Sequence, residues 1–246
     1  MKLISSKMTI PPEAPPISRQ RLLDALQGSL NSGGSTVISG RAGTGKTMLA
    51  TDFARCCGRR VAWYKVDAPD GDLRVFMEYL VESVARESPG FGGKTLAHHS
   101  QSTGQSVSAL VEAYIQDLER LEEPLLVVFD DLHLVYDADW VVPFFQRMLT
   151  LLPAEAHMLI MGRGMPPAPL WRLRYKPRLS VINEPMLAFT QAEAEALFTI
   201  YGLDAQQATV AFMQTGGRAA ALHAAAMRAE VEERNIFDDR LITPMC

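Results

Sequence analysis

The stretch Gly40-Arg41-Ala42-Gly43-Thr44-Gly45-Lys46-Thr47 matches the P-loop pattern G-x-x-x-x-G-K-[ST] at every fixed position. In such a loop the backbone N–H groups point inward around a phosphate, and glycines permit both the backbone angles and the close approach. The helix that follows adds its free N–H groups and the positive end of its dipole. We expect Lys46 to reach the β- and γ-phosphates and the Thr47 hydroxyl to bind Mg²⁺.

The residues on both sides of this loop support nucleotide binding. A β-rich run, 35–39, precedes the loop, and residues 48–54 have the pattern of a helix. An ordinary Gly-rich turn is the alternative, but the motif requires a strand before it and a helix after it, and both are predicted here. The expected nucleotide contacts are Gly40, Gly43, Thr44, Gly45, Lys46, Thr47 and Met48.

A second motif ends the most apolar run of the chain, where residues 125–129 lead into Asp130-Asp131. Continuous apolar runs of this kind belong in parallel sheets that are covered on both faces. Asp130, at the carboxyl end of the strand, is expected to hold Mg²⁺ through water, opposite Thr47. Asp131 stands where many P-loop ATPases carry the acid that orients the attacking water. Its alternative role is to cap the next turn.

Strands and helices alternate along the first three quarters of the chain. Apolar runs predict strands at 35–39, 61–66, 125–131 and 157–163, with a candidate fifth at 179–183. This order predicts an α/β fold: a P-loop NTPase parallel sheet with helices on both faces. From Thr190 the pattern is purely helical, with helices near 190–201, 205–214 and 218–234. We therefore expect a nucleotide-binding domain at 1–186 and a small, lid-like helical subdomain at 187–246.

Two segments are predicted to lack regular structure. Residues 1–18 contain four prolines and are expected to form an extended N-terminal arm. Residues 87–105 are rich in Gly and Ser and are expected to form a mobile loop. The pair His98-His99 lies in that loop, and two adjacent histidines alone are more typical of a solvated loop than of a metal site.

Composition excludes several classes of protein. The 246 residues are 48% hydrophobic and 21% charged, as in soluble globular proteins. The net charge of −4 gives no reason to expect nucleic acid or an anionic membrane as a partner. No run is long enough for a signal peptide or a membrane span. The three cysteines form no CxxC pair, which favours reduced thiols in a cytoplasm.

Several blocks of this sequence also occur, in the same order and spacing, in a known module. They resemble the ATPase module of MalT-type regulators, the large ATP-binding members of the LuxR group within the STAND class of P-loop NTPases. The resemblance covers nearly the whole chain, and its most specific parts are Asp-Asp-x-His and Phe-Thr-x-x-Glu-Ala. The matching blocks are residues 17–23, 40–47, 61–63, 129–133, 162–163, 170–174 and 187–194.

The resemblance implies a switch with slow ATP hydrolysis. In such proteins ADP holds a closed monomer, while an inducer together with ATP opens it and drives self-association. A winged-helix segment, a helical-repeat sensor and a DNA-binding domain normally follow the module. DNA contact is therefore expected only through a domain outside this chain, which is either a fragment or a stand-alone module.

Individual residues can be carried over from the resemblance. Arg163 matches an arginine that reads the γ-phosphate, and the alternative is a solvated surface arginine. With Lys46 and Asp131 it completes the expected catalytic set. Arg19 matches a position near the adenine and phosphate pocket. The chain departs from the family at Gly217-Arg218-Ala219, where Gly-Trp-Pro is usual, and at Arg41, which replaces a proline and should point outward.

Two other functions compete with the switch. An AAA-like ring-forming ATPase motor or loader needs an arginine supplied by a neighbouring subunit, for which Arg172, Arg174 and Arg178 are candidates. A DNA-binding module would use the last two helices as a helix-turn-helix. The would-be recognition helix at 218–224 is Ala-rich and is followed by three glutamates, which oppose contact with DNA phosphates.

Overall fold

The computed structural model describes residues 3–100, 106–172 and 179–242. They contain a five-stranded sheet with the strand order β2-β3-β4-β1-β5, in which every neighbouring pair is parallel. The parallel α/β sheet predicted from the sequence is confirmed, including its fifth strand. The strands are β1 (Ser35–Ser39), β2 (Arg60–Lys65), β3 (Leu125–Asp130), β4 (Ala156–Gly162) and β5 (Leu179–Ile182).

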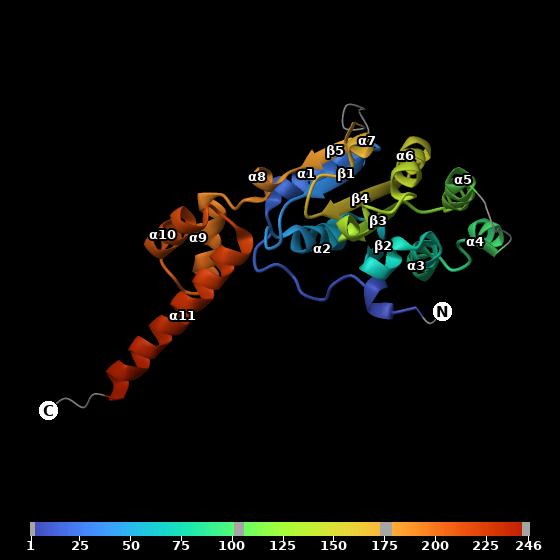
Figure 1. Cartoon of the computed structure of the whole chain (residues 1–246). Coiled ribbons are helices and arrows are strands. Elements are labelled where there is room, and N and C mark those ends of the chain that lie inside the picture. The colour runs from blue at the N-terminus through green and yellow to red at the C-terminus, as the bar shows by residue number, and fades with distance from the viewer. Residues whose placement is uncertain (1–2, 101–105, 173–178, 243–246) are drawn as a thin grey trace.

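Helices cover both faces of this sheet, as predicted (Figure 1). Successive strand residues point to opposite faces, so Val37 joins one apolar cluster and Ile38 the other. The Ile38 side packs against α1 (Gln20–Asn31) and α2 (Lys46–Cys56). The Val37 side packs against α3 (Leu73–Glu87), α5 (Val107–Leu118) and α6 (Val141–Leu151). Three short helices, η2 (Ala68–Gly71), η3 (Leu132–Val135) and α7 (Ala168–Trp171), also belong to this part.

The C-terminal part is helical and has an apolar cluster of its own, which includes Phe189, Leu197 and Leu222. Its helices are α8 (Glu184–Leu187), α9 (Gln191–Ile200), α10 (Ala205–Thr215) and α11 (Ala219–Ile242). A capping box starts α9, because Thr190 and Glu193 each accept the other's backbone N–H. Helix α11 runs past the end expected at 234 and leads away from the rest of the molecule (Figure 1). We call residues 184–242 the helical part.

The prediction of an arm without regular structure is wrong for residues 5–8. They form a 3-10 helix, η1 (Ser5–Met8), in which Lys7 is only 6% exposed. The Lys7 ammonium donates to the Asp70 carboxylate at 2.7 Å and lies 4.2 Å from the centre of the Tyr79 ring. A partner 63 positions away thus holds this segment in place. Residues 9–18 are neither helix nor strand, as expected.

The prediction of a loop at 87–105 is wrong for its central part, because residues 93–100 form α4 (Gly93–Ser100). Asp117 of α5 accepts hydrogen bonds from the Thr95 N–H at 2.9 Å and from the Thr95 hydroxyl at 2.7 Å, which satisfies donors at the start of α4. His98 and His99 belong to this helix, and residues 101–105 lie outside the described residues. Within the described ranges, no helix combines the length and apolar character needed to cross a membrane.

Candidate nucleotide-binding site

The P-loop connects β1 to α2 at the carboxyl edge of the sheet, where open α/β sheets bind their ligands. Gly43 and Gly45 have φ angles of 79° and 82°, in the left-handed region that other residues rarely adopt. The Gly40 N–H donates to the Gly162 carbonyl at 3.2 Å, which ties the start of the loop to the end of β4. The loop therefore has a defined backbone shape that depends on its glycines.

Lys46, at the start of α2, is 7% exposed, and its ammonium lies against the backbone of the loop. It donates to the Gly40 carbonyl at 2.6 Å and to the Arg41 carbonyl at 3.0 Å. Burial lowers the pKa of Lys46, while the negative charges of Asp131 and Asp130 act in the opposite direction. The structure thus brings the predicted lysine and both predicted acids to one edge of the sheet.

Thr47 and Asp130 lie together, as the sequence predicts for a magnesium site. The Thr47 hydroxyl donates to the two carboxylate oxygens of Asp130 at 3.3 and 3.2 Å. Asp130 is 2% exposed, and its burial, with a smaller contribution from Asp131, raises its pKa to about 6. A hydroxyl and a carboxylate are hard oxygen donors of the kind that Mg²⁺ prefers, and a cation would favour the ionised form of this buried acid. These two residues fit a magnesium ion.

Asp131 immediately precedes η3 and has a φ of 57°, which makes it the one non-glycine residue with positive φ among those described. Its side chain makes no capping hydrogen bond to η3, so the alternative capping role has no support in the geometry. The carboxylate lies 3.8 Å from His133 Nδ1. Burial lowers the pKa of His133, and Asp131 opposes that shift.

Arg163 follows β4 at the same edge and is exposed. Its positive charge contributes to lowering the pKa of both Lys46 and His133, which places it within electrostatic reach of the loop. Among the other candidate arginines, Arg172 is exposed, and Arg174 and Arg178 lie outside the described residues. Arg41 points outward, as expected, and its side chain pairs with Glu184 at 2.6 Å.

Arg19 braces the P-loop from outside. It is 5% exposed, and its guanidinium donates to the Gly45 carbonyl at 3.0 Å and to the Leu187 carbonyl at 2.6 Å. The guanidinium carbon also lies 5.1 Å from the centre of the Phe189 ring. Burial lowers the pKa of Arg19 to about 10, so it remains charged at neutral pH.

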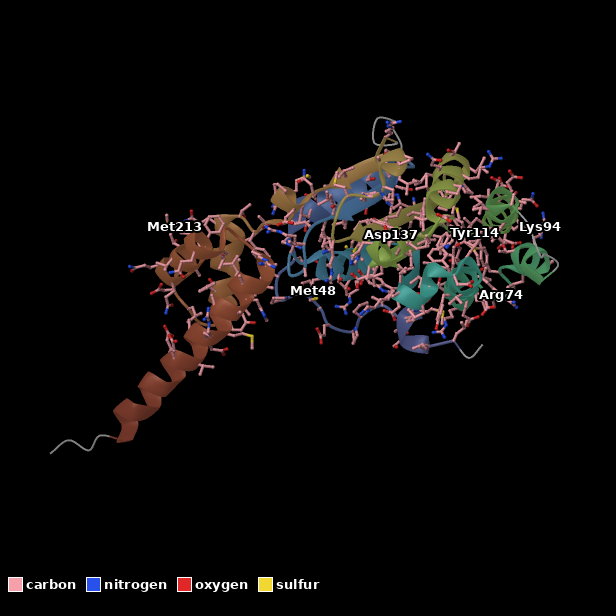
Figure 2. All side chains as sticks on the ribbon, in the orientation of Figure 1. Met48, Arg74, Lys94, Tyr114, Asp137 and Met213 are labelled. Atoms are coloured by element: carbon pink, nitrogen blue, oxygen red, sulfur yellow. The ribbon has the colours of Figure 1, made fainter. Side chains whose placement is uncertain are left out.

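A cavity of about 330 Å³ opens beside the loop. Its lining is largely apolar and comes from the N-terminal arm, α2, α9 and α11, and its size and character suit a small-molecule ligand. Figure 2 shows Met48, one of the predicted contacts, at the junction between the sheet and the helical part. The lining includes Ile17, Arg19, Met48, Asp52, Phe189 and His223.

Sequence reasoning missed several residues around this cavity. His223 of α11 lines it and shares a hydrogen bond of 2.6 Å with the Tyr201 hydroxyl. Arg218 donates to the Ala42 carbonyl of the P-loop at 2.6 Å. Both residues are about 175 positions from the P-loop, so no local pattern in the sequence marks them. The altered Gly217-Arg218-Ala219 segment was the one signal available.

The fold and the geometry of this edge define a P-loop ATPase domain. Residues 16–161 match the family model described as AAA ATPase domain. Because the match spans more than half of the chain, the chain belongs to the AAA ATPase domain family.

The chain is also similar in sequence to curated proteins and in fold to a solved structure. The chain is 30% identical over 198 residues to the HTH-type transcriptional regulator MalT of Serratia proteamaculans (strain 568), and 30% identical over 197 residues to the protein of the same name from Yersinia enterocolitica. Each match covers 80% of this chain and 22% of the relative, so the chain spans about a fifth of the length of these proteins. The structure of the Aeropyrum pernix ORC1 protein in complex with DNA shares the fold, with a TM-score of 0.55 at 17% identity over 92% of this chain and 63% of that one.

Proposed function

We propose that this chain is an ATP- and ADP-binding signalling switch with slow ATP hydrolysis, and that it serves as the nucleotide-binding module of a transcriptional regulator. One observation carries the proposal. The Lys46 ammonium, the Thr47 hydroxyl and the buried Asp130 carboxylate meet at the edge of the sheet beside the apolar cavity. This arrangement combines a place for phosphates with a place for a nucleoside.

Each predicted residue has a role in this proposal. The inward N–H groups of the loop and Lys46 bind the phosphates. Thr47 and Asp130 hold Mg²⁺, which supplies charge neutralisation to the phosphates when bound. Asp131 orients the attacking water, and Arg163 contacts the γ-phosphate. Arg19 and Met48 lie at the nucleoside end of the site.

Two features support a switch over a fast enzyme. We call the residues before 184 the sheet-containing part. The cavity is lined by residues of both this part and the helical part, so a bound nucleotide would contact both. The curated relatives are named as transcriptional regulators. We therefore propose self-association in the ATP state, control by a small-molecule or protein inducer, and DNA contact through another domain.

The first test is a titration of Lys46→Ala with ADP and ATP. The substitution removes the ammonium that the phosphates would contact, while the loop keeps its glycines, so the fold should survive and nucleotide binding should be lost. Circular dichroism checks that the variant is folded, and calorimetric titration of the folded variant measures its affinity for ADP and ATP. Wild-type affinity in the folded variant would refute nucleotide binding in this loop.

A ring-forming ATPase is the second candidate, favoured by membership of the AAA ATPase domain family. It requires an arginine from a neighbouring subunit to act on the γ-phosphate, and Arg172 is an exposed candidate. The two functions differ in their dependence on protein concentration. A ring requires turnover per chain to rise steeply with concentration and to fall when Arg172 is replaced by alanine.

A further inference from the structure

The tip of the P-loop is held from outside by Arg218, just before α11, and by the first turn of α11. The Arg218 guanidinium donates to the Ala42 carbonyl at 2.6 Å, and the Ala220 N–H donates to the Gly43 carbonyl at 2.9 Å. Ala220 lies in the first turn of α11, where N–H groups have no partner within the helix. Two donors of the helical part therefore meet two consecutive carbonyls of the loop.

These contacts matter because of how a P-loop binds phosphate. When its N–H groups point inward around a phosphate, the carbonyls at its tip face away from the phosphate and are open to donors from outside the loop. Other carbonyls of the loop find donors in the sheet-containing part: Lys46 serves Gly40 and Arg41, and Arg19 serves Gly45. At the tip, by contrast, both donors come from the helical part: Arg218 donates to the Ala42 carbonyl and Ala220 to the Gly43 carbonyl.

Packing at the same place is equally close. A Cβ atom added to Gly43 would lie 3.0 Å from the Ala220 Cβ atom, and one added to Gly45 would lie 3.2 Å from the Ala219 Cβ atom. The start of α11 and the two left-handed glycines of the loop are therefore in direct contact. Interiors packed this closely transmit strain, so the shape of the loop tip and the position of α11 constrain each other.

We infer that Arg218 is a positioning residue that couples nucleotide binding in the P-loop to the docking of α11. The inference rests on the proposed function. The coupling is reciprocal. If docking of α11 strengthens nucleotide binding by a given free energy, a bound nucleotide stabilises the docked helix by the same amount. The α11 helix has 24 residues and is about 36 Å long, so a small rotation at its start moves its far end by much more (Figure 1).

The chain offers a matched control for this coupling. Arg228 is also exposed and lies on α11, but its guanidinium donates to the Ala224 carbonyl of its own helix. Arg218→Met and Arg228→Met each remove one positive charge, the first immediately before α11 and the second within it. We expect about five- to tenfold weaker ADP affinity for Arg218→Met, as for one lost hydrogen bond to a charged donor, and unchanged affinity for Arg228→Met. Arg218→Lys should recover part of the loss, since it keeps a cationic donor.

Hydrogen exchange at the Ala220 amide gives a readout that a general loss of stability would not reproduce. In the wild type this amide should exchange slowly, and ADP should slow it further. In Arg218→Met it should exchange faster and respond less to ADP, while amides in the middle of α9 remain unchanged. Uniformly faster exchange over the helical part would assign Arg218 a merely structural role and overturn the inference.

The inference and the proposed function fail in different ways. If Lys46→Ala loses ADP binding while Arg218→Met binds ADP as tightly as the wild type, nucleotide binding stands and the coupling through Arg218 is refuted. If the wild type binds no adenine nucleotide, the proposed function is refuted, and the coupling with it. Both the proposed function and the coupling are supported if Arg218→Met binds ADP more weakly and its Ala220 amide responds less to ADP.

Discussion

Asp130 is a carboxylate held almost entirely out of water, at 2% exposure, with the Thr47 hydroxyl against it. In Asp130→Asn a neutral amide replaces the charged partner that a hard cation requires. We expect nucleotide affinity to fall about tenfold in the presence of Mg²⁺ and much less in EDTA. Parallel ADP titrations with Mg²⁺ and with EDTA measure the difference. Equal losses under both conditions would assign Asp130 a structural role instead.

His157 gives stability a dependence on pH. It is 1% exposed in β4, and burial, helped by the charge of Arg59, lowers its pKa from 6.5 to about 4. Between these two values the unfolded chain binds the proton and the folded chain does not. Stability is therefore fully present above about pH 6.5 and is lost as the pH falls towards 4.

Comparison with a His157→Gln variant isolates this contribution. From pH 7.5 to pH 5 we expect His157 to remove about 2 kcal/mol from the free energy of unfolding of the wild type. Asp130, whose pKa is raised to about 6, has the opposite sign, but it is common to both proteins and cancels in the comparison. Urea unfolding at the two pH values provides the measurement. If the stability of the two proteins changed equally between these pH values, the predicted contribution of His157 would be contradicted.

At the scale of single elements, the sequence predicted the features that depend on a local pattern of residues. Strands β1 to β4 were predicted from their apolar runs, because residues buried on both faces are marked by composition alone, whereas the half-buried edge strand β5 was only a candidate. The P-loop and Asp130 were found from spacing. The capping box at Thr190 and Glu193 was read from four consecutive residues and is present in the structure.

Elements fixed by distant contacts were missed. Helix α4 depends on the Asp117 carboxylate, 22 positions after Thr95, and η1 depends on Asp70. A Gly- and Ser-rich segment or a proline-rich arm carries no local sign of such a partner. The far wall of the cavity was missed for the same reason, because His223 reaches it only through the packing of the helical part.

Breaking the buried ion pair between Lys7 of η1 and Asp70 should lower the stability of the protein substantially. Lys7→Met leaves the Asp70 carboxylate, at 1% exposure, buried without its cation, which costs about 3 kcal/mol of stability. The double variant Lys7→Met/Asp70→Asn should regain part of this loss, since it removes the unpaired charge. Urea unfolding of the three proteins tests the pair. A loss below about 1 kcal/mol in Lys7→Met would mean that η1 is held by its apolar contacts.

At the scale of the whole molecule, the helical part has its own apolar cluster and meets the sheet-containing part at the P-loop. We propose that residues 1–186 and 187–246 act as two units around the nucleotide. Arg19 joins them directly, because its guanidinium bonds to the loop at Gly45 and to Leu187 beyond β5. The long α11 extends from this junction away from the site, so a change in the orientation of the helical part would move its far end (Figure 1).

This arrangement has a consequence for the rate of hydrolysis. Phosphoryl transfer needs aligned water, metal and positive charge around the γ-phosphate. Asp131 and Arg163 supply part of that set, and the remaining contacts are proposed to come from another domain or a second copy. Asp131→Asn should therefore slow the residual turnover and leave ATP affinity nearly intact, since this residue orients water and does not hold the nucleotide.

The most direct test of the switch is phosphate release by the monomeric protein at saturating Mg-ATP, measured over a range of protein concentrations. We predict saturable turnover well below about 1 s⁻¹, the low end of ordinary enzymes, which Lys46→Ala abolishes. Turnover above that rate, independent of protein concentration, would contradict the switch and identify a self-sufficient ATPase.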